Sequence, residues 1–124
     1  MARILLIDDD AQLLKVMEIT LQKSGHEIFP APDGKVALNL LKTQPVDLII
    51  TDIVMPEADG IEVISSFIGT ESRPPIIAIS GGSQRLDPDS LLKLARAMKV
   101  DLAIAKPFTP LELLKAVDTV LAKL

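Results

Sequence analysis

Several residue types that often carry chemistry are missing from this sequence or nearly so. It has no cysteine, tryptophan or tyrosine, three phenylalanines and one histidine, His26. Without cysteine the chain can form neither a disulfide nor a thiolate metal site, and one histidine is too few for a typical zinc enzyme. With so few aromatic side chains, the core must be built from leucine, isoleucine, valine and alanine.

Clustered basic residues and long hydrophobic runs are also absent from the sequence. The formal net charge is -4, and no stretch concentrates lysine and arginine, which disfavours direct binding to nucleic acid. No apolar window approaches the length of a membrane span, and the first apolar run is too short for a signal peptide. We therefore expect a cytoplasmic protein that makes no membrane contact. Its 124 residues, 48% of them hydrophobic, predict one domain covering residues 1–124.

Four short apolar runs dominate what is present. Runs of this length, continuous rather than alternating, are typical of strands that are buried on both faces of a parallel sheet. They cover residues 4–7, 48–50, 76–79 and 102–105. A weaker run at residues 26–29 predicts a further strand, which is second in chain order.

Helical patterns separate the apolar runs. The first has Leu13, Met17 and Leu21 at helical spacing, with Asp10 as the expected N-cap and Gly25 as the stop. Four further helices are expected to begin near Asp33-Gly34, Asp59-Gly60, Asp87-Pro88 and Thr109-Pro110. The last of these starts is a capping box with proline at the first helical position. This alternation predicts an α/β fold, a doubly wound five-stranded parallel sheet with five helices.

Polar side chains that could perform chemistry follow the apolar runs directly. In chain order they are Asp8, Asp9 and Asp10, then Asp52, then Ser80, and finally Lys106. Doubly wound sheets bind ligands at the carboxyl ends of their strands, beside the point where the strand order reverses. We therefore expect carboxylates, one hydroxyl and one ammonium to converge on a single pocket.

Carboxylates held close together repel one another, and a divalent cation relieves that repulsion. Mg²⁺ prefers oxygen ligands and needs only one or two carboxylates, which Asp9 and Asp52 could supply with Asp8 in support. A carboxylate beside the cation can attack a phosphoryl group, and Lys106 and Ser80 could then bind phosphoryl oxygens. The set therefore predicts phosphoryl-transfer chemistry.

Taken one at a time, these residues have simpler explanations. An aspartate after a strand is usually a helix cap, which is our interpretation of Asp10, and Asp33 and Asp59 are expected to be turn or cap residues. A single lysine is most often on the surface, a Ser-Gly-Gly-Ser stretch is often an ordinary loop, and His26 is expected at a strand edge. The joint occurrence of the polar residues at four strand ends favours the functional interpretation.

Five segments occur in a specific order along the chain. They are Ile7-Asp8-Asp9-Asp10, Thr51-Asp52-Ile53-Val54-Met55-Pro56, Asp59-Gly60, Ser80-Gly81 and Lys106-Pro107-Phe108. As a set they resemble the receiver domain of bacterial two-component response regulators, the chemotaxis-regulator type, and the resemblance covers the whole chain. It implies a flavodoxin-like (βα)5 receiver fold and a phosphorylation-dependent signalling switch that is not an enzyme.

The resemblance also implies where phosphorylation and metal binding occur. Asp52 would accept a phosphoryl group from a sensor histidine kinase or a histidine phosphotransfer protein. Asp8 and Asp9 would be the acidic pair of the family, and Mg²⁺ would bind to Asp9, Asp52 and the backbone carbonyl of Val54.

The signalling output is likewise given by the resemblance. Ser80 would be the switch hydroxyl and Lys106 the phosphate-binding lysine, joined to Pro107 by a cis peptide bond. The downstream target would be a protein that the sequence does not identify, and a phosphorylation-dependent dimer is compatible with the family pattern. We expect a stand-alone receiver, although a segment trimmed from a longer regulator would have the same sequence.

Three features depart from the family pattern. Ala103 stands where an aromatic residue is common, and the stretch from Ser80 to Lys106 is a few residues longer than usual. We therefore expect the switch to act through the loop after Ser80 and the helix that follows it. Val54 and Gly82 replace polar residues that help to orient the hydrolytic water, which predicts a long-lived phosphoryl group.

Two other functions compete with that of a phosphorylated receiver. A Mg²⁺-dependent phosphatase of the haloacid-dehalogenase type also uses an aspartate nucleophile, and Asp8 and Asp10 could imitate its Asp-x-Asp motif. However, Gln12 stands where that motif has threonine, and no strand with paired acids follows Lys106. The other alternative is a degenerate receiver that only binds partners, which the intact acids, Ser80 and Lys106 disfavour.

Overall fold

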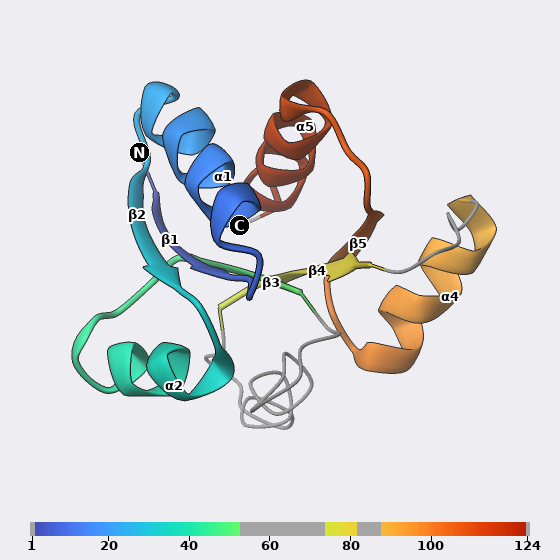
Figure 1. Ribbon diagram of the computed structural model, residues 1–124. Helices are drawn as coiled ribbons and strands as arrows, with labels where there is room; N and C mark the ends of the chain where they lie inside the picture. Colours follow the sequence, from blue (N-terminus) through green and yellow to red (C-terminus); the bar gives the residue numbers. More distant parts are fainter. Residues whose placement is uncertain (1, 53–73, 82–87, 124) are drawn as a thin grey trace.

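Five parallel strands form a single sheet in the computed structural model, which describes residues 2–52, 74–81 and 88–123. The strands are β1 (Arg3–Ile7), β2 (Glu27–Ala31), β3 (Leu48–Asp52), β4 (Ile76–Ser80) and β5 (Leu102–Ala105). Their order across the sheet is β2-β1-β3-β4-β5, so β2 is added on one side of β1 and the later strands on the other (Figure 1). This reversal beside β1 confirms the predicted doubly wound, flavodoxin-like topology.

Helices cover both faces of the sheet. The helices α1 (Ala11–Lys23) and α5 (Pro110–Leu121) lie on one face, and α2 (Gly34–Thr43) and α4 (Pro88–Met98) lie on the other (Figure 1). The helix expected to begin at Asp59-Gly60 lies outside the described residues, as does Asp87 before α4. In the described ranges, four of the five predicted helices are therefore present. None of these four is long and apolar enough to cross a membrane.

The core is aliphatic on both sides of the sheet. Successive residues of a strand point to opposite faces. Leu6 and Ile50 therefore pack with residues of α1 and α5, whereas Leu5 and Ile49 pack in a second cluster with Ala37 of α2. All five of these side chains are fully buried. Burial on both faces explains why the apolar runs in the sequence are continuous rather than alternating.

Three helix starts have the caps that the sequence predicts. Asp10, Asp33 and Thr109 are the N-caps of α1, α2 and α5, and each side chain accepts a backbone N–H of the first turn. Thr109 and Glu112 complete the capping box with hydrogen bonds of 3.1 Å in both directions. The first helix ends just before Gly25, whose φ of 91° is the left-handed conformation that glycine adopts readily.

The weakest predicted strand is displaced along the chain. The strand β2 begins at Glu27 rather than at His26, and it continues through Pro30 to Ala31. Pro30 is tolerated because β2 is an edge strand, where a missing N–H need not break a ladder. His26 precedes the strand, and its Nδ1 accepts the Ala2 N–H at 3.1 Å. This contact gives His26 a structural role at the edge of the sheet.

The strand register aligns the carboxyl ends of the central strands. Across neighbouring strands, the paired residues are Ile7 and Thr51, Asp52 and Ile79, and Ser80 and Ala105. One edge of the sheet therefore holds the last residues of β3 and β4 and the residues that follow β1 and β5. That edge holds the predicted site residues that the structure describes, which are Asp8, Asp9, Asp52, Ser80 and Lys106.

Candidate functional site

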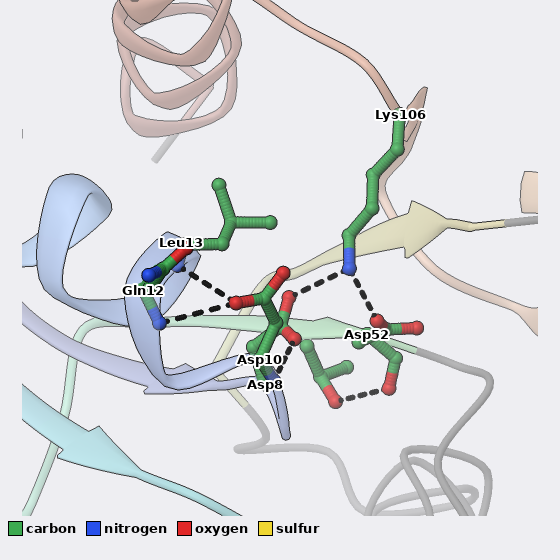
Figure 2. Close-up of polar contacts among 7 residues, drawn as sticks. Asp8, Asp10, Gln12, Leu13, Asp52 and Lys106 are labelled. Atoms are coloured by element: carbon green, nitrogen blue, oxygen red, sulfur yellow. Dashed lines mark hydrogen bonds and ion pairs between the residues drawn. The ribbon is translucent and has the colours of Figure 1, made fainter.

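Lys106 lies between two buried aspartates at the carboxyl edge of the sheet. Its Nζ donates to Asp52 Oδ2 at 2.7 Å and lies 3.0 Å from Asp8 Oδ2 (Figure 2). Lys106 follows β5, Asp52 ends β3 and Asp8 follows β1. One cation thus compensates two carboxylates that the sheet topology brings together.

The charge state of Lys106 follows from these two partners. Burial by itself lowers the pKa of the ammonium, but the carboxylates of Asp52 and Asp8 together outweigh that effect. The pKa of Lys106 is therefore raised above its usual value, and the side chain is an ammonium at neutral pH. Its backbone N–H donates to the Ser80 carbonyl at 2.9 Å, and its peptide bond to Pro107 is cis, as predicted.

Asp8 is fully buried. Its Oδ1 accepts the Asp10 N–H at 2.9 Å, whereas Oδ2 is in the ion pair with Lys106 but accepts no hydrogen bond from the described residues. Burial raises the pKa of the Asp8 carboxyl, and the Asp10 N–H and the Lys106 ammonium act in the opposite direction. A buried carboxylate oxygen with unused acceptor capacity is a feature expected of a ligand site.

Asp52 ends β3 with 3% of its surface exposed. Because β3 is the central strand, Asp52 lies between the groups that follow β1 and those that follow β5. The hydroxyl of the buried Thr51 donates to the Asp52 carbonyl oxygen at 3.0 Å. This contact is not predictable from the sequence, because a threonine in a strand is usually explained by β propensity alone.

Asp8, Asp9 and Asp52 form an acidic cluster that fits a divalent cation. Each offers one carboxylate oxygen, and these oxygens lie within 4.8 Å of one another. With all three ionised, their three negative charges and the single positive charge of Lys106 leave two negative charges, which a divalent cation would neutralise. The oxygen donors, together with the exposure of Asp9, suit Mg²⁺, which keeps part of its water shell.

The backbone after β4 passes directly beside this cluster. Ser80 ends β4, and a Cβ added at Gly81 would lie 3.5 Å from Lys106 Cδ and 3.9 Å from Asp52 Oδ2. A Cβ at this position would make ordinary van der Waals contacts, so the backbone of Gly81 runs close to both Lys106 and Asp52. Val54 and Gly82, which the sequence also named, lie outside the described residues.

An open cavity of about 390 Å³ adjoins Lys106. The residues that line it are Asp10, Leu13, Lys106, Pro107 and Phe108. They come from the first turn of α1 and from the connection between β5 and α5. Lys106, which contacts Asp8 and Asp52, is therefore also part of the wall of this cavity.

The structure brings most of the predicted site residues together, but not all of them. Asp8, Asp9, Asp52 and Lys106 come together, and Ser80 lies at the adjacent strand end. Asp10 is not a member of the acidic cluster, because its carboxylate caps α1, as the sequence predicted. Sequence reasoning also missed the hydrogen bond from the Asp10 N–H to Asp8, for which the run of three aspartates gives no signal.

Sequence comparison assigns most of the chain to one family. Residues 4–118 match the family model described as the response regulator receiver domain. The response regulator GtcR of Aneurinibacillus migulanus is 36% identical over 109 residues, which are 88% of this chain and 43% of that protein. The alkaline phosphatase synthesis transcriptional regulatory protein PhoP of Bacillus subtilis is 30% identical over 121 residues, 98% of this chain and 49% of that protein. The chain spans about half the length of these curated relatives.

Structure comparison agrees with the sequence match. The chemotaxis protein CheY4 of Vibrio cholerae superimposes with a TM-score of 0.81 and 29% sequence identity. The match covers 97% of this chain and 98% of that chain. The likeness therefore extends over the sheet and its helices, including the strand ends where the acidic cluster lies.

Proposed function

Because this chain belongs to the response regulator receiver domain family, we propose that Asp52 accepts a phosphoryl group from the phosphohistidine of a sensor histidine kinase or a histidine phosphotransfer protein. The contact of 2.7 Å between Asp52 Oδ2 and Lys106 Nζ carries this proposal. It holds a nearly buried carboxylate beside a cation, at the edge of the sheet where the acidic cluster lies.

The proposed transfer moves one phosphoryl group between two nucleophiles. A carboxylate oxygen of Asp52 attacks the phosphorus, the phosphorus–nitrogen bond breaks, and the imidazole nitrogen leaves with its electron pair. The negative charge that Asp52 loses on becoming an acyl phosphate is replaced by charge on the phosphoryl oxygens. Lys106, already within hydrogen-bonding distance of Asp52, follows that charge and binds a phosphoryl oxygen.

The acidic cluster supports a role for Mg²⁺. The ligands in this proposal are Asp9, Asp52 and the backbone carbonyl of Val54, with Asp8 in support; the part played by Val54 rests on the family pattern alone. When bound, the cation supplies charge neutralisation for the phosphoryl oxygens. Asp9 is the exposed member of the cluster and opens it to solvent, whereas Asp8 supports the cluster from within the protein.

Ser80 is the proposed switch hydroxyl. It ends β4, pairs with Ala105 and accepts the Lys106 N–H through its carbonyl, so the ends of β4 and β5 are tied together. A hydrogen bond from the Ser80 hydroxyl to a phosphoryl oxygen would draw this strand end toward Asp52. The change would then reach α4, the next helix in the described part of the chain.

Receiver domains are generally signalling modules, and we propose that this one has no turnover of small phosphomonoesters. The alternative of a haloacid-dehalogenase-type phosphatase predicts steady release of inorganic phosphate from such a substrate in the presence of Mg²⁺. The alternative of a degenerate receiver predicts that Asp52 is never phosphorylated. An assay for phosphate release and an assay for phosphorylation of Asp52 therefore distinguish a phosphorylated receiver, a phosphatase and a degenerate receiver.

The partners and setting of this proposal follow the family. Residues 1–124 would act as one receiver domain in the cytoplasm. Its partners would be a kinase or phosphotransfer protein and a downstream protein, with a phosphorylation-dependent dimer as a further form. We propose that this domain itself binds neither nucleic acid nor a membrane.

Incubation with acetyl phosphate and Mg²⁺, followed by intact-mass spectrometry, tests the phosphoacceptor. The wild-type chain should gain one phosphoryl group, and Asp52→Asn should gain none while keeping its fold. Asp33→Asn is the matched control, because asparagine is as good an N-cap as aspartate and Asp33 is not part of the acidic cluster. Undiminished labelling of Asp52→Asn would place the acceptor elsewhere, and an unlabelled wild-type chain would favour the degenerate receiver.

A further inference from the structure

The backbone N–H of Asp10 donates a hydrogen bond to Asp8, and the side chain of Asp10 accepts hydrogen bonds from the first turn of helix α1 (Figure 2). We propose that Asp10 is a positioning residue for the metal site: its capping carboxylate fixes the turn after β1, and the N–H held in that turn sets the orientation of the Asp8 carboxylate. This inference rests on the proposed binding of Mg²⁺ to the acidic cluster. It assigns no ligand role to Asp10 itself.

Asp10 is fixed by four hydrogen bonds that involve three different parts of the residue. Its Oδ1 accepts the N–H groups of Gln12 and Leu13, each at 3.1 Å, and its carbonyl accepts the Leu14 N–H at 2.9 Å. Its own N–H donates to Asp8 Oδ1 at 2.9 Å. The side chain and the carbonyl thus attach Asp10 to the first turn of α1, and the N–H transmits that position to Asp8.

This arrangement decides which oxygen of Asp8 is available to the site. Oδ1 is occupied by the Asp10 N–H, so Oδ2 is the oxygen that lies against Lys106. Because Asp8 is fully buried, losing the N–H would leave a desolvated carboxylate oxygen unpaired, which is costly. We expect the carboxylate to turn in search of a new partner, and the acidic cluster would then lose its present geometry.

The charge of Asp10 offers a competing explanation for any effect on the metal. A nearby negative charge attracts a cation without any positioning. However, Asp10 Oδ1 faces the N-terminal turn of α1, and Asp10 is not among the three residues of the acidic cluster. Asparagine keeps the capping oxygen but removes the charge, so Asp10→Asn separates position from charge.

The same contacts would couple helix α1 to the site. Asp10 and Leu13 line the cavity beside Lys106, so a partner that displaces the first turn of α1 would move the N–H that holds Asp8. The affinity for the partner and the affinity for Mg²⁺ would then depend on each other, since such coupling is reciprocal.

Titration with Mg²⁺, followed by calorimetry on the whole chain, measures the effect. Asp10→Ala should weaken Mg²⁺ binding by about 10-fold, the lower end of what is lost when a group that orients a metal ligand is removed. Asp10→Asn should stay within about 2-fold of wild type, because asparagine caps a helix as well as aspartate does. Asp33→Ala removes the same carboxylate from the N-cap of α2 and should leave Mg²⁺ affinity unchanged. The proposal is overturned if Asp10→Asn loses as much affinity as Asp10→Ala, or if Asp10→Ala loses none.

A second measurement needs no metal. Hydrogen exchange at the amide of residue 10, followed by NMR, should be slow in the wild-type chain and in Asp10→Asn, and fast in Asp10→Ala. Equal exchange in all three chains would overturn the positioning role even if the affinities differ. If the wild-type chain binds no Mg²⁺, the proposed metal function fails, whereas the exchange pattern still decides whether Asp10 holds its N–H against Asp8.

Discussion

The ammonium of Lys106 lies 2.7 Å from Asp52 Oδ2 and 3.0 Å from Asp8 Oδ2, so one side chain balances two carboxylates that are nearly or fully buried. Lys106 itself keeps 23% of its side chain exposed. Without it, the two carboxylates would face each other across the strand ends with no positive charge in the described part of the cluster. The stability of the sheet edge and the chemistry proposed for it therefore depend on the same residue.

Lys106→Ala should lower the free energy of unfolding in the absence of metal. We expect a loss of roughly 1–3 kcal/mol, below the range for a fully buried pair because Lys106 is partly exposed. Mg²⁺ should restore part of this loss, because the cation supplies the missing positive charge. Urea denaturation with and without Mg²⁺ measures both effects, with Lys42→Ala on the exposed side of α2 as the control. An equal loss in the presence and absence of Mg²⁺ would contradict this account.

Asp8→Asn should stabilise the metal-free protein at neutral pH. Burial raises the pKa of Asp8 in the folded state, so its contribution to stability is fully present only below its unfolded-state pKa and is lost as pH rises through the folded-state pKa. At neutral pH the charged group therefore opposes folding, and the amide removes that charge while keeping an oxygen for the Asp10 N–H.

The gain expected from Asp8→Asn is on the order of 1 kcal/mol, an ordinary size for a single substitution. Denaturant unfolding at neutral pH and again below the ordinary aspartate pKa checks the sign. The difference between the two chains should shrink in acid, where the wild-type Asp8 is protonated. A variant that is less stable than wild type at neutral pH would show that the ion pair with Lys106 outweighs the cost of burial.

Asp9→Ala should weaken Mg²⁺ binding but leave the free energy of unfolding nearly unchanged. Asp9 is the exposed member of the acidic cluster, so its removal should change the free energy of unfolding by less than about 0.5 kcal/mol. Mg²⁺ affinity should nevertheless fall by at least about 10-fold, because the cation loses a charged oxygen ligand. Phosphorylation by acetyl phosphate should fall with it. Tight Mg²⁺ binding in this variant would remove Asp9 from the ligand set.

The strands that the sequence predicts best come from continuous apolar runs. The runs that became β1, β3, β4 and β5 are continuous and apolar, so their position in the chain is readable without tertiary information. Partial burial alone does not explain the weaker prediction of β2, because the other edge strand, β5, is also only partly buried. In β2, Glu27 and Pro30 interrupt the apolar residues, and its predicted start at His26 was wrong by one residue and its end by two.

The membership of the acidic cluster was predictable for a different reason. The carboxyl ends of neighbouring parallel strands must lie at one edge, so Asp8, Asp9 and Asp52 had to come close once the sheet was assigned. Their burial was not predictable, because it depends on how the turn after β1 packs. The sequence does not distinguish the buried Asp8 from the exposed Asp9, nor does it show that Lys106 would contact two carboxylates.

The switch should act through the end of β4 and helix α4, because Ala103 has no ring that could change rotamer. Ala103 is buried on β5 and pairs with Ala78, whereas Ser80 ends β4 beside the cluster and holds the Lys106 N–H. A phosphate mimic such as beryllofluoride at Asp52 would draw the Ser80 hydroxyl toward it, provided that the bound group favours one state of this strand end over the other.

NMR shift mapping with and without beryllofluoride tests this route. In the wild-type chain, amides of Gly81 and of residues 88–98 should respond together with those around Asp52. Ser80→Ala is the decisive variant, because it removes the hydroxyl but leaves the acidic cluster and Lys106 intact. It should still bind beryllofluoride at Asp52, and the response of residues 88–98 should be much smaller. If α4 responds equally in both chains, the signal does not pass through Ser80; if α4 responds in neither while the pocket is occupied, the output surface lies elsewhere on the domain.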